Sequence, residues 1–350
     1  MKTTRLLVLL SFVLAAGCQP TMQDMPEAAQ AQALPPKTVG SIERADPRID
    51  ALIPVGAEVE VLEEGFDWSE GPVWVPSMNA VLFSDIPRNT IHSWSESDGL
   101  GVFLRPAGYN RDNPQGKELG TNGLFLDASG NLLASNHGFR GITRLNQDNY
   151  TWTVLVDRYQ GKRLNSPNDL VLRGNGDIYF TDPSYGLEGW EKSPDRELDF
   201  NGVYHLTPAG KLTLLTKEFK NPNGIGLSPD QSILYVAQSN GQEPVIRAYD
   251  IQADGSIANG RVFFDATELN AQTGRRGGFD GFVVDAAGNI FTSGPGGVLV
   301  LTPAGEYLGT ILTGQATANA TFGGANGSEL FITADMLLLR VRTSTKGIGF

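Results

Sequence analysis

The chain has 350 residues, with 42 glycines, 20 prolines, one cysteine and a formal net charge of -12. An acidic chain without a cluster of Lys and Arg has no basic face for neutralising phosphates, which argues against nucleic-acid binding. One cysteine excludes a disulfide framework and a zinc site built from several cysteines. The glycines lie in short clusters between apolar segments, which predicts many tight turns.

The N-terminus resembles a secretion signal. Lys2 and Arg5 give it a positive start, and the segment from Leu6 to Ala16 is apolar apart from one serine. That segment is too short to span a bilayer as a helix. Small residues then precede Cys18, as in the bacterial lipoprotein box. We therefore expect residues 1–17 to be a signal peptide and Cys18 to be lipidated, with ordinary signal-peptidase cleavage as the alternative.

Residues 18–50 are expected to form a flexible tether. They are rich in Ala, Gln and Pro and show no apolar period, so they cannot bury enough surface to repay the entropy of ordering them. By the lipoprotein resemblance, Gln19 after the cysteine favours the outer membrane of a bacterial envelope, facing the periplasm. A chain without the lipid would be secreted. The oligomeric state stays open.

The rest of the chain, residues 51–350, repeats one sequence unit six times. Each unit opens with a polar residue and continues with an apolar strand, a turn and a second apolar strand, and further strand-like segments separate the units. The opening residues are Glu70, Asn122, Asn168, Asn223, Asp280 and Asn319. Units of this length hold about four short strands, the content of one propeller blade. No convincing helical period appears, which argues against a Rossmann arrangement.

Ring closure needs a strand from the other end of the repeat region. Too few residues follow Asn319 for a complete last blade, whereas the alternating segment from Glu58 to Glu63 can supply the missing outer strand. The sequence therefore predicts an all-β protein, a single six-bladed β-propeller.

The opening residues are expected to meet at the propeller axis, because equivalent positions of all blades converge there at one face. Two carboxylates and four carboxamides without Cys or His form a set of hard oxygen donors suited to Ca²⁺ and unsuited to a structural Zn²⁺ site. The alternative is that pairs such as Asn-Gly and Asp-Gly only mark turns. Six such residues in one register favour a metal site.

Several motifs resemble those of a known family. They are SEGPVW (Ser69 to Trp74), GTNGLFLD (Gly120 to Asp127), NHGFR (Asn136 to Arg140), GKRLNSPNDLV (Gly161 to Val171), YFTDPSYG (Tyr179 to Gly186), NPNGIGLSPD (Asn221 to Asp230) and FDGFVVDAAGNIF (Phe279 to Phe291). Together they resemble the gluconolactonase branch of the family of senescence-marker protein, gluconolactonase and luciferin-regenerating enzyme.

The resemblance implies a propeller with one divalent cation, Ca²⁺ or else Zn²⁺ or Mg²⁺, that hydrolyses sugar lactones. It implies Glu70, Asn168, Asn223 and Asp280 as metal ligands and places Asn122 at the substrate. A cation there would bind the lactone carbonyl oxygen and stabilise the charge that develops as water attacks. Asp280 would orient or deprotonate that water, or act as a nucleophile.

Four further residues are candidates around this site. His137 is expected to donate a hydrogen bond or shuttle a proton beside the lactone, or else to be a structural histidine bonded to the blade. Arg140 either binds sugar hydroxyls or pins a loop. Asp182 and Tyr185 are expected to line the pocket rim and bind substrate, although Asp-Pro is also a turn signal.

Two other functions remain open from the sequence. Diisopropylfluorophosphatase and the paraoxonases resemble this architecture, so hydrolysis of a phosphotriester or a lipophilic lactone is the enzymatic alternative. A non-catalytic, envelope-tethered propeller that binds a ligand is the other. Serine-hydrolase chemistry is disfavoured because the chain has no G-x-S-x-G.

Overall fold

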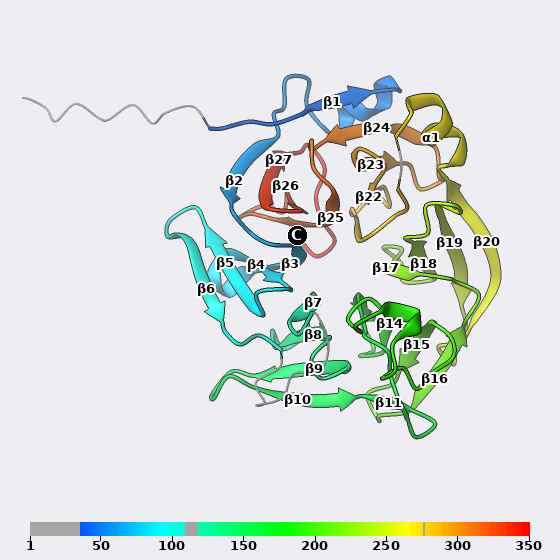
Figure 1. The fold of residues 1–350 in the computed structure, drawn as a ribbon. Helices are drawn as coiled ribbons and strands as arrows, with labels where there is room; N and C mark the ends of the chain where they lie inside the picture. Colours follow the sequence, from blue (N-terminus) through cyan, green and yellow to red (C-terminus); the bar gives the residue numbers. More distant parts are fainter. Residues whose placement is uncertain (1–35, 109–117, 276) are drawn as a thin grey trace, which may run out of the picture. The chain divides into compact units, whose positions relative to one another are not determined.

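The computed structural model describes residues 36–108, 118–275 and 277–350. The expected signal peptide, Cys18 and the first half of the expected tether lie outside these residues. Most of the described strands form six antiparallel sheets of four or five strands, arranged as a ring of blades, and a short two-stranded sheet lies outside them (Figure 1). The prediction of an all-β, six-bladed β-propeller is confirmed. Within the described ranges, no helix has the length and apolar character needed to cross a membrane.

The blades follow one another along the chain, each with its first strand at the axis and its later strands farther out. Blade 1 has β3 (Ser69–Val75), β4 (Ala80–Asp85), β5 (Thr90–Ser95) and β6 (Gly99–Leu104). Blade 2 has β7 (Thr121–Leu126), β8 (Leu132–Asn136), β9 (Gly141–Asn146) and β10 (Thr151–Val156). Blade 3 has β13 (Leu170–Leu172), β14 (Ile178–Asp182), β15 (Gly202–Leu206) and β16 (Leu212–Thr216). Blade 4 has β17 (Pro222–Leu227), β18 (Ile233–Gln238), β19 (Val245–Ile251) and β20 (Ile257–Asp265).

Strands from both ends of the chain complete the last two blades. Blade 5 has β21 (Phe282–Val284), β22 (Ile290–Gly294), β23 (Gly297–Leu301), β24 (Tyr307–Leu312) and, outermost, β1 (Ser41–Arg44). Blade 6 has β25 (Thr317–Gly323), β26 (Glu329–Ala334), β27 (Leu337–Arg342) and, outermost, β2 (Glu60–Glu64). The elements outside the blades are η1 (Pro47–Ala51), η2 (Pro76–Met78), β11 (Arg158–Tyr159), β12 (Lys162–Arg163), η3 (Trp190–Lys192) and α1 (Thr267–Thr273).

Strand β2 closes the ring as its alternating sequence predicts. It pairs antiparallel with β27, with Glu60 opposite Arg340. The Arg340 guanidinium, of which 6% is exposed, lies 2.6 Å from Glu60 and 2.9 Å from Glu329 of β26. It also lies 2.7 Å from Glu96, which follows β5. The buried Arg340 thus connects β2, from the N-terminal part of the chain, with β26 and β27 of the same blade. It also connects blade 6 with blade 1.

The expected tether is shorter than the sequence suggested. Ser41–Arg44 form β1, which pairs antiparallel with β24, and Pro47–Ala51 form a 3-10 helix whose Ile49 is fully buried. The compact unit accordingly begins at Pro36 instead of at residue 51. The polar composition of this segment gave no sign of a strand, because an outermost strand can be ordered by backbone pairing and a few apolar contacts.

Apolar side chains fill the interfaces between blades instead of a single central core. Each blade is covered on both faces by its neighbours, so a strand such as β4, with all its residues buried, does not alternate. Trp74 of blade 1 stacks on Phe331 of blade 6, with ring centroids 5.6 Å apart. Every blade interface holds such a cluster. Because the apolar side chains pack between blades, polar side chains can occupy the axis, where the inner strands meet.

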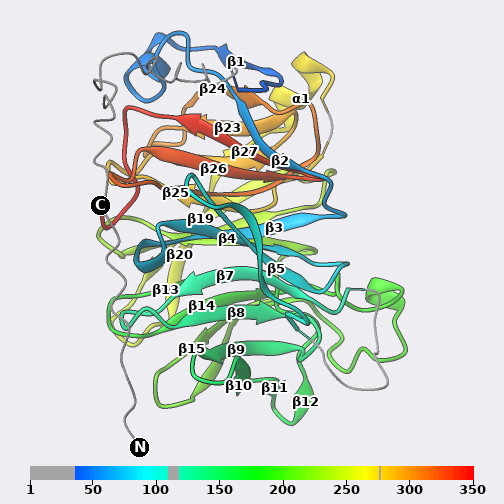
Figure 2. The same ribbon diagram turned by 90° about the vertical axis from the view of Figure 1, so that its left-hand side faces the viewer.

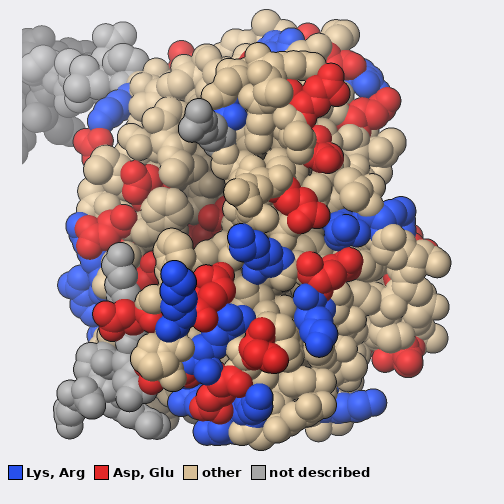
Figure 3. Space-filling view, turned by 45° about the vertical axis from the view of Figure 1, so that its right-hand side comes forward, with Lys and Arg blue, Asp and Glu red and all other residues tan. Residues whose placement is uncertain are grey.

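Charged side chains are mixed on the surface. On the face drawn in Figure 3, Lys and Arg side chains lie interspersed with Asp and Glu, and that face carries no continuous basic patch. On this face the acidic residues are therefore spread among basic ones.

Candidate active site

The six opening residues lie at one end of the inner strands, around the axis. Five of them are buried, and Asp280 is the partly exposed member. The pairing of the inner strand with its neighbour is irregular at this point in four blades. Such bulges turn a side chain out of the ladder. The six opening residues lie at these places in the fold: Glu70 of β3, Asn122 of β7, Asn168 before β13, Asn223 of β17, Asp280 before β21 and Asn319 of β25.

Glycines after the opening residues let neighbouring blades touch. The Gly224 amide donates to the Asp280 carbonyl at 3.2 Å, and a Cβ on Gly224 would lie only 2.3 Å from that oxygen. The Gly123 amide likewise donates to the Asn168 carbonyl at 2.9 Å. A side chain at either position would push the blades apart. Part of the glycine excess thus sets the width of the ring.

Side-chain contacts join the ring across the axis. The Asn319 amide hydrogen-bonds to the Glu70 carboxylate, and the Asn223 amide hydrogen-bonds to Asp280. The carboxyl groups of Glu70 and Asp280 also interact with each other. Residues that lie far apart in sequence therefore meet within one small polar site, as their common register predicts.

The sequence analysis missed a third carboxylate, Asp169. It follows Asn168, at the position where four other units have glycine, and its side chain points into the ring. Its Oδ1 accepts from the Leu170 amide at 2.9 Å, and Asn319 also donates to it. Its charge acts on both Glu70 and Asp280. Among the six units, this is the one that has a charged residue at that position, which was the signal that could have identified it.

The three carboxylates are crowded and poorly solvated. Burial, and next the charge of Asp280, raises the pKa of Glu70 well above its usual value. Burial raises the pKa of Asp169 to about 7, and burial together with the Asp169 charge raises that of Asp280 to about 7. Buried carboxylates this close to one another repel, and binding of a proton or a metal cation relieves that repulsion.

The oxygen atoms of this ring fit a hard cation. The Oδ1 atoms of Asn122, Asn223 and Asp280 are buried and accept no hydrogen bond from described residues. Unsatisfied buried oxygens are uncommon and call for an ion or water. No group of three or more His, Cys, Asp and Glu arranged to hold a metal is found within the described residues. A cation here would depend on asparagine oxygens as well as carboxylates, a donor set that suits Ca²⁺.

Tyr185 lies beside this ring, and its role at the pocket rim stays a prediction. Its hydroxyl hydrogen-bonds with Ser239, whose Oγ accepts from the Asn223 amide at 2.7 Å. Burial raises the pKa of Tyr185 to about 12, with the Asp280 charge acting in the same direction. Its hydroxyl is therefore protonated at neutral pH and can donate to a ligand.

His137 is buried near the ring, next to a residue that the sequence analysis missed. Neither ring nitrogen has a hydrogen-bond partner within the described ranges, and Nδ1 lies 3.6 Å from Glu118 Oε2. A Cβ on Gly186 would lie 2.7 Å from His137 Cγ, so Gly186 lets the loop pack on the imidazole. The Glu118 charge in turn acts on Asp280. Because its ring nitrogens make no hydrogen bond to described residues, His137 can donate one to a ligand or accept one from it, and its role there stays a prediction.

Arg140 and Asp182 hold loops in the structure. Arg140 Nε donates to the Leu164 carbonyl at 2.8 Å and Nη1 to the Asp195 carbonyl at 2.9 Å, leaving only Nη2 without a partner. Asp182 is fully buried, and its Oδ2 accepts from the Asn165 amide at 2.9 Å. We had predicted that Asp182 lines the rim. Its burial gives it instead the role of fixing the loop that leads to Asn168.

Asp182 should make stability depend on pH. Burial raises its pKa to about 7, so the folded protein keeps a proton that the unfolded chain loses near pH 4. Between these values, rising pH should destabilise the wild type relative to Asp182→Asn by up to about 1.4 kcal/mol per pH unit. Urea unfolding of both proteins from pH 4.5 to 7.5 measures the difference between their free energies of unfolding. Titrating groups that the two proteins share contribute equally to both and cancel in this difference. A difference that stays constant over this range would contradict it.

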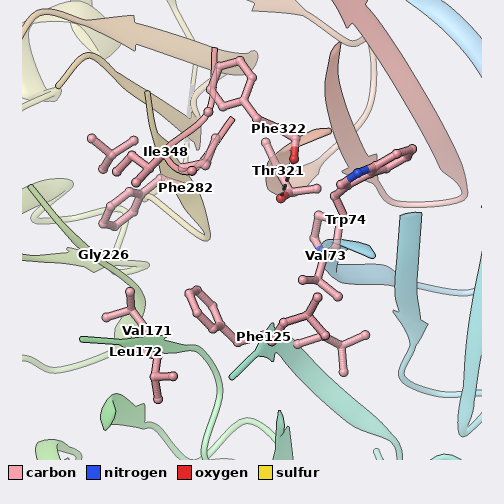
Figure 4. Close-up of a pocket in the computed structure, with 18 of the residues that line it drawn as sticks. Val73, Trp74, Phe125, Val171, Leu172, Gly226, Phe282, Thr321, Phe322 and Ile348 are labelled. Atoms are coloured by element: carbon pink, nitrogen blue, oxygen red, sulfur yellow. Dashed lines mark hydrogen bonds between the residues drawn. The ribbon is translucent and has the colours of Figure 1, made fainter. Parts of the chain in front are cut away.

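A cavity extends along the inner strands from the ring, at Asp169 and Asn319, toward their opposite end (Figure 4). It has a volume of about 600 Å³ and is mainly apolar, with Phe125, Val171 and Phe282 among its walls. Only Asp169 among its lining residues carries a charge. Away from the ring its walls offer no paired polar groups, so the candidate chemistry belongs to the ring end of this channel.

The comparisons with known proteins agree with this geometry. Residues 68–335 match the family model described as the SMP-30/gluconolactonase/LRE-like region. A gluconolactonase from Zymomonas mobilis is 39% identical over 314 residues, which are 89% of this chain and 88% of that protein. Human regucalcin is 28% identical over 278 residues, 78% of this chain and 85% of its own. The chain therefore belongs to the SMP-30/gluconolactonase/LRE-like family.

Solved structures show the same architecture. A gluconolactonase from Xanthomonas campestris is 32% identical and superposes with a TM-score of 0.75, covering 88% of this chain and 96% of its own. A calcium-binding regucalcin from Agrobacterium tumefaciens, 20% identical, superposes with a TM-score of 0.65 over 82% of this chain and 94% of its own. At that identity the second likeness shows the fold alone.

Proposed function

We propose that this lactonase opens a sugar lactone to its aldonic acid with the help of a divalent cation held by Glu70, Asn168, Asn223 and Asp280. The observation that carries the proposal is the ring of oxygen donors whose buried atoms, Asn223 Oδ1 and Asp280 Oδ1 among them, lack partners. The gluconolactonase relatives support the substrate class. The regucalcin relatives support a divalent cation.

The cation would act as a Lewis acid that polarises the lactone carbonyl. Asp280 is the one partly exposed member of the six opening residues and interacts with the Asn223 side chain, and it would take a proton from the attacking water. As that water oxygen bonds to the acyl carbon, the bond from this carbon to the ring oxygen breaks. The departing oxygen takes a proton, for which the unpartnered His137 is the nearby donor.

Substrate is oriented by the polar groups around Asp280. The Tyr185 hydroxyl and the Asn122 amide can hydrogen-bond to sugar hydroxyls, because neither side chain is consumed by bonds inside a blade. Asp169 and Glu70 lie deeper along the axis and contribute negative charge that retains the cation.

Removal of the metal should abolish both activity and part of the stability. With D-glucono-1,5-lactone, we expect acid release above the spontaneous rate that a chelator stops and Ca²⁺ restores. The same titration should raise the melting temperature, because Ca²⁺ at a hundred times its Kd stabilises the fold by about 2.7 kcal/mol. A pH-stat and calorimetry measure the two effects. Equal rates with and without enzyme would refute lactone hydrolysis, and chelator-insensitive hydrolysis would refute the metal requirement.

Two further substrates test the other enzymatic functions. A phosphotriester and a lipophilic lactone should be hydrolysed at less than a tenth of the sugar-lactone rate, which corresponds to a difference of about 1.4 kcal/mol in activation free energy. A preference for either one would replace the sugar lactone as the substrate class and leave the cation site in place.

A further inference from the structure

One exposed tryptophan lies on the face that carries the ring of ligands. Of the five tryptophans, Trp190 is 57% exposed, whereas Trp74 and Trp94 are buried and Trp68 and Trp152 are half-buried. The other exposed aromatic residues among those described are Tyr150 and Phe350. Phe350 lines the apolar cavity at the opposite end, and Tyr150 lies in the turn between β9 and β10 at that same opposite end.

The loop from β14 to β15 presents Trp190. Strand β14 runs antiparallel to β13, so it ends at the face where Asn168 begins the inner strand. The loop leaves β14 after Asp182 and returns at Gly202, with Trp190 at the start of η3. Figure 2 shows this loop projecting on the side of the ring opposite the C-terminus.

Local bonds hold the loop in a conformation that costs energy. Trp190 has a φ of 54°, a left-handed conformation that is unfavourable for a bulky residue. Its amide donates to the Leu187 carbonyl at 3.0 Å, and its carbonyl accepts from the Ser193 amide at 3.0 Å. Glu191 Oε1 accepts from the Asn221 side chain at 3.2 Å, which ties the loop to the segment leading into Asn223. A strained residue beside a site, held by several bonds, suggests a use for its side chain.

A short series of contacts connects the indole with the ring. The Trp190 and Tyr185 rings lie 6.1 Å apart and nearly perpendicular, at 87°. Tyr185 in turn hydrogen-bonds with Ser239, the partner of Asn223, and feels the charge of Asp280. Trp190 is thus linked to Asp280 through Tyr185, on the side where the part of a substrate remote from its reacting carbonyl would lie.

We propose that Trp190 is the platform on which the C–H face of the sugar ring packs, and that it sets the preference for sugar lactones. This rests on the proposed lactonase function. One face of a pyranose presents C–H bonds, which pack on an aromatic face, while the hydroxyls at the ring edge remain free for hydrogen bonds. Tyr185, edge-on to the indole, supplies a hydroxyl at that edge. Remote contacts of this kind bind substrate without taking part in the chemistry.

Kinetics with two variants and a matched control test the proposal. Trp190→Ala should raise the KM for D-glucono-1,5-lactone about tenfold, the loss expected for one aromatic contact, and leave kcat within about threefold. Trp190→Phe should keep most of the affinity. Tyr150→Ala is the control, because Tyr150 is also an exposed aromatic residue with a φ of 54° but lies at the opposite face. Equal KM values for Trp190→Ala and wild type, or a loss in kcat alone, would overturn the platform.

Fluorescence provides a readout that does not need turnover. Trp190→Phe should lose most of the emission that acrylamide quenches, because the other four tryptophans are less exposed. In the wild type, D-glucono-1,5-lactam, a ring analogue that resists hydrolysis, should protect this emission, whereas δ-valerolactam without hydroxyls should not. Unchanged quenching with the sugar lactam would overturn the proposal. If no lactone is hydrolysed, the proposed function fails, and the lactam titration still decides whether Trp190 binds sugar rings.

Discussion

Asp280→Asn is expected to lower kcat/KM for a sugar lactone by about 10²–10⁴-fold, the range for loss of a general base. The substitution removes the proton acceptor and one of the negative charges that hold the cation, while the amide keeps the size of the side chain. Stabilisation by added Ca²⁺ should weaken at the same time. Acid release in a pH-stat and thermal melting with and without Ca²⁺ measure the two effects on one protein.

Asp285→Asn is the matched control for Asp280→Asn. Asp285 is a buried carboxylate in the same blade, just past the other end of β21, and it accepts from the amides of Ala287 and Asn289. Its loss should lower stability and leave kcat/KM of the folded protein within about threefold, since it lies outside the ring. Comparable activity losses in both variants would show that Asp280 acts only through folding.

Arg340→Met is expected to lower the free energy of unfolding by about 3–5 kcal/mol, the cost of leaving buried carboxylates without their cation. Glu60 and Glu329 are 13% and 21% exposed, so water only partly replaces the guanidinium. Arg340 also lies over the Trp94 ring, 5.6 Å from its centroid, and methionine keeps only the apolar part of that contact. Urea unfolding monitored by circular dichroism measures the loss.

Arg342→Met is the control for Arg340→Met, because it removes a positive charge that also contacts Glu60 but is exposed. Arg342 Nε lies 3.2 Å from the same Glu60, but 58% of its side chain is exposed. An exposed pair contributes about 0–1 kcal/mol, so this variant should unfold close to the wild type. If both arginine variants lost the same small amount, the buried cluster would not be what closes the ring.

The fold could be predicted because each repeat unit has a recognisable local sequence pattern. Each hairpin carries its own turn residues and apolar strands, and the alternating segment that becomes β2 stood out before the first unit. Strand β1 could not be recognised in this way. Ser41–Arg44 are partly exposed and polar, and they are ordered through pairing with β24, a strand made long after them. Such long-range pairing leaves no local pattern.

The convergence of the opening residues was predictable by register, and their surroundings were not. Glu70 and Asp280 interact in the structure because equivalent positions of a propeller converge. Glu118 and Trp190 belong to segments outside the repeat, whose conformations depend on the loops they pack on. Asp182, by contrast, sits in a motif that suggests a rim, yet the fold buries it against the Asn165 amide. Sequence spacing cannot reveal which side of a strand end a carboxylate will face.

The pairing of β2 with β27 has a consequence for the growing chain. Glu60 and Arg340 are 280 residues apart, so β2 emerges from the ribosome long before the strand that covers its edge exists. Contacts of such separation form late and slow folding. Meanwhile β2 offers an unpaired strand edge, but its sequence, EVLEE, places three negative charges among five residues. Like charges discourage pairing between nascent chains, so the acidic strand that later binds Arg340 also protects the unfinished propeller from aggregation.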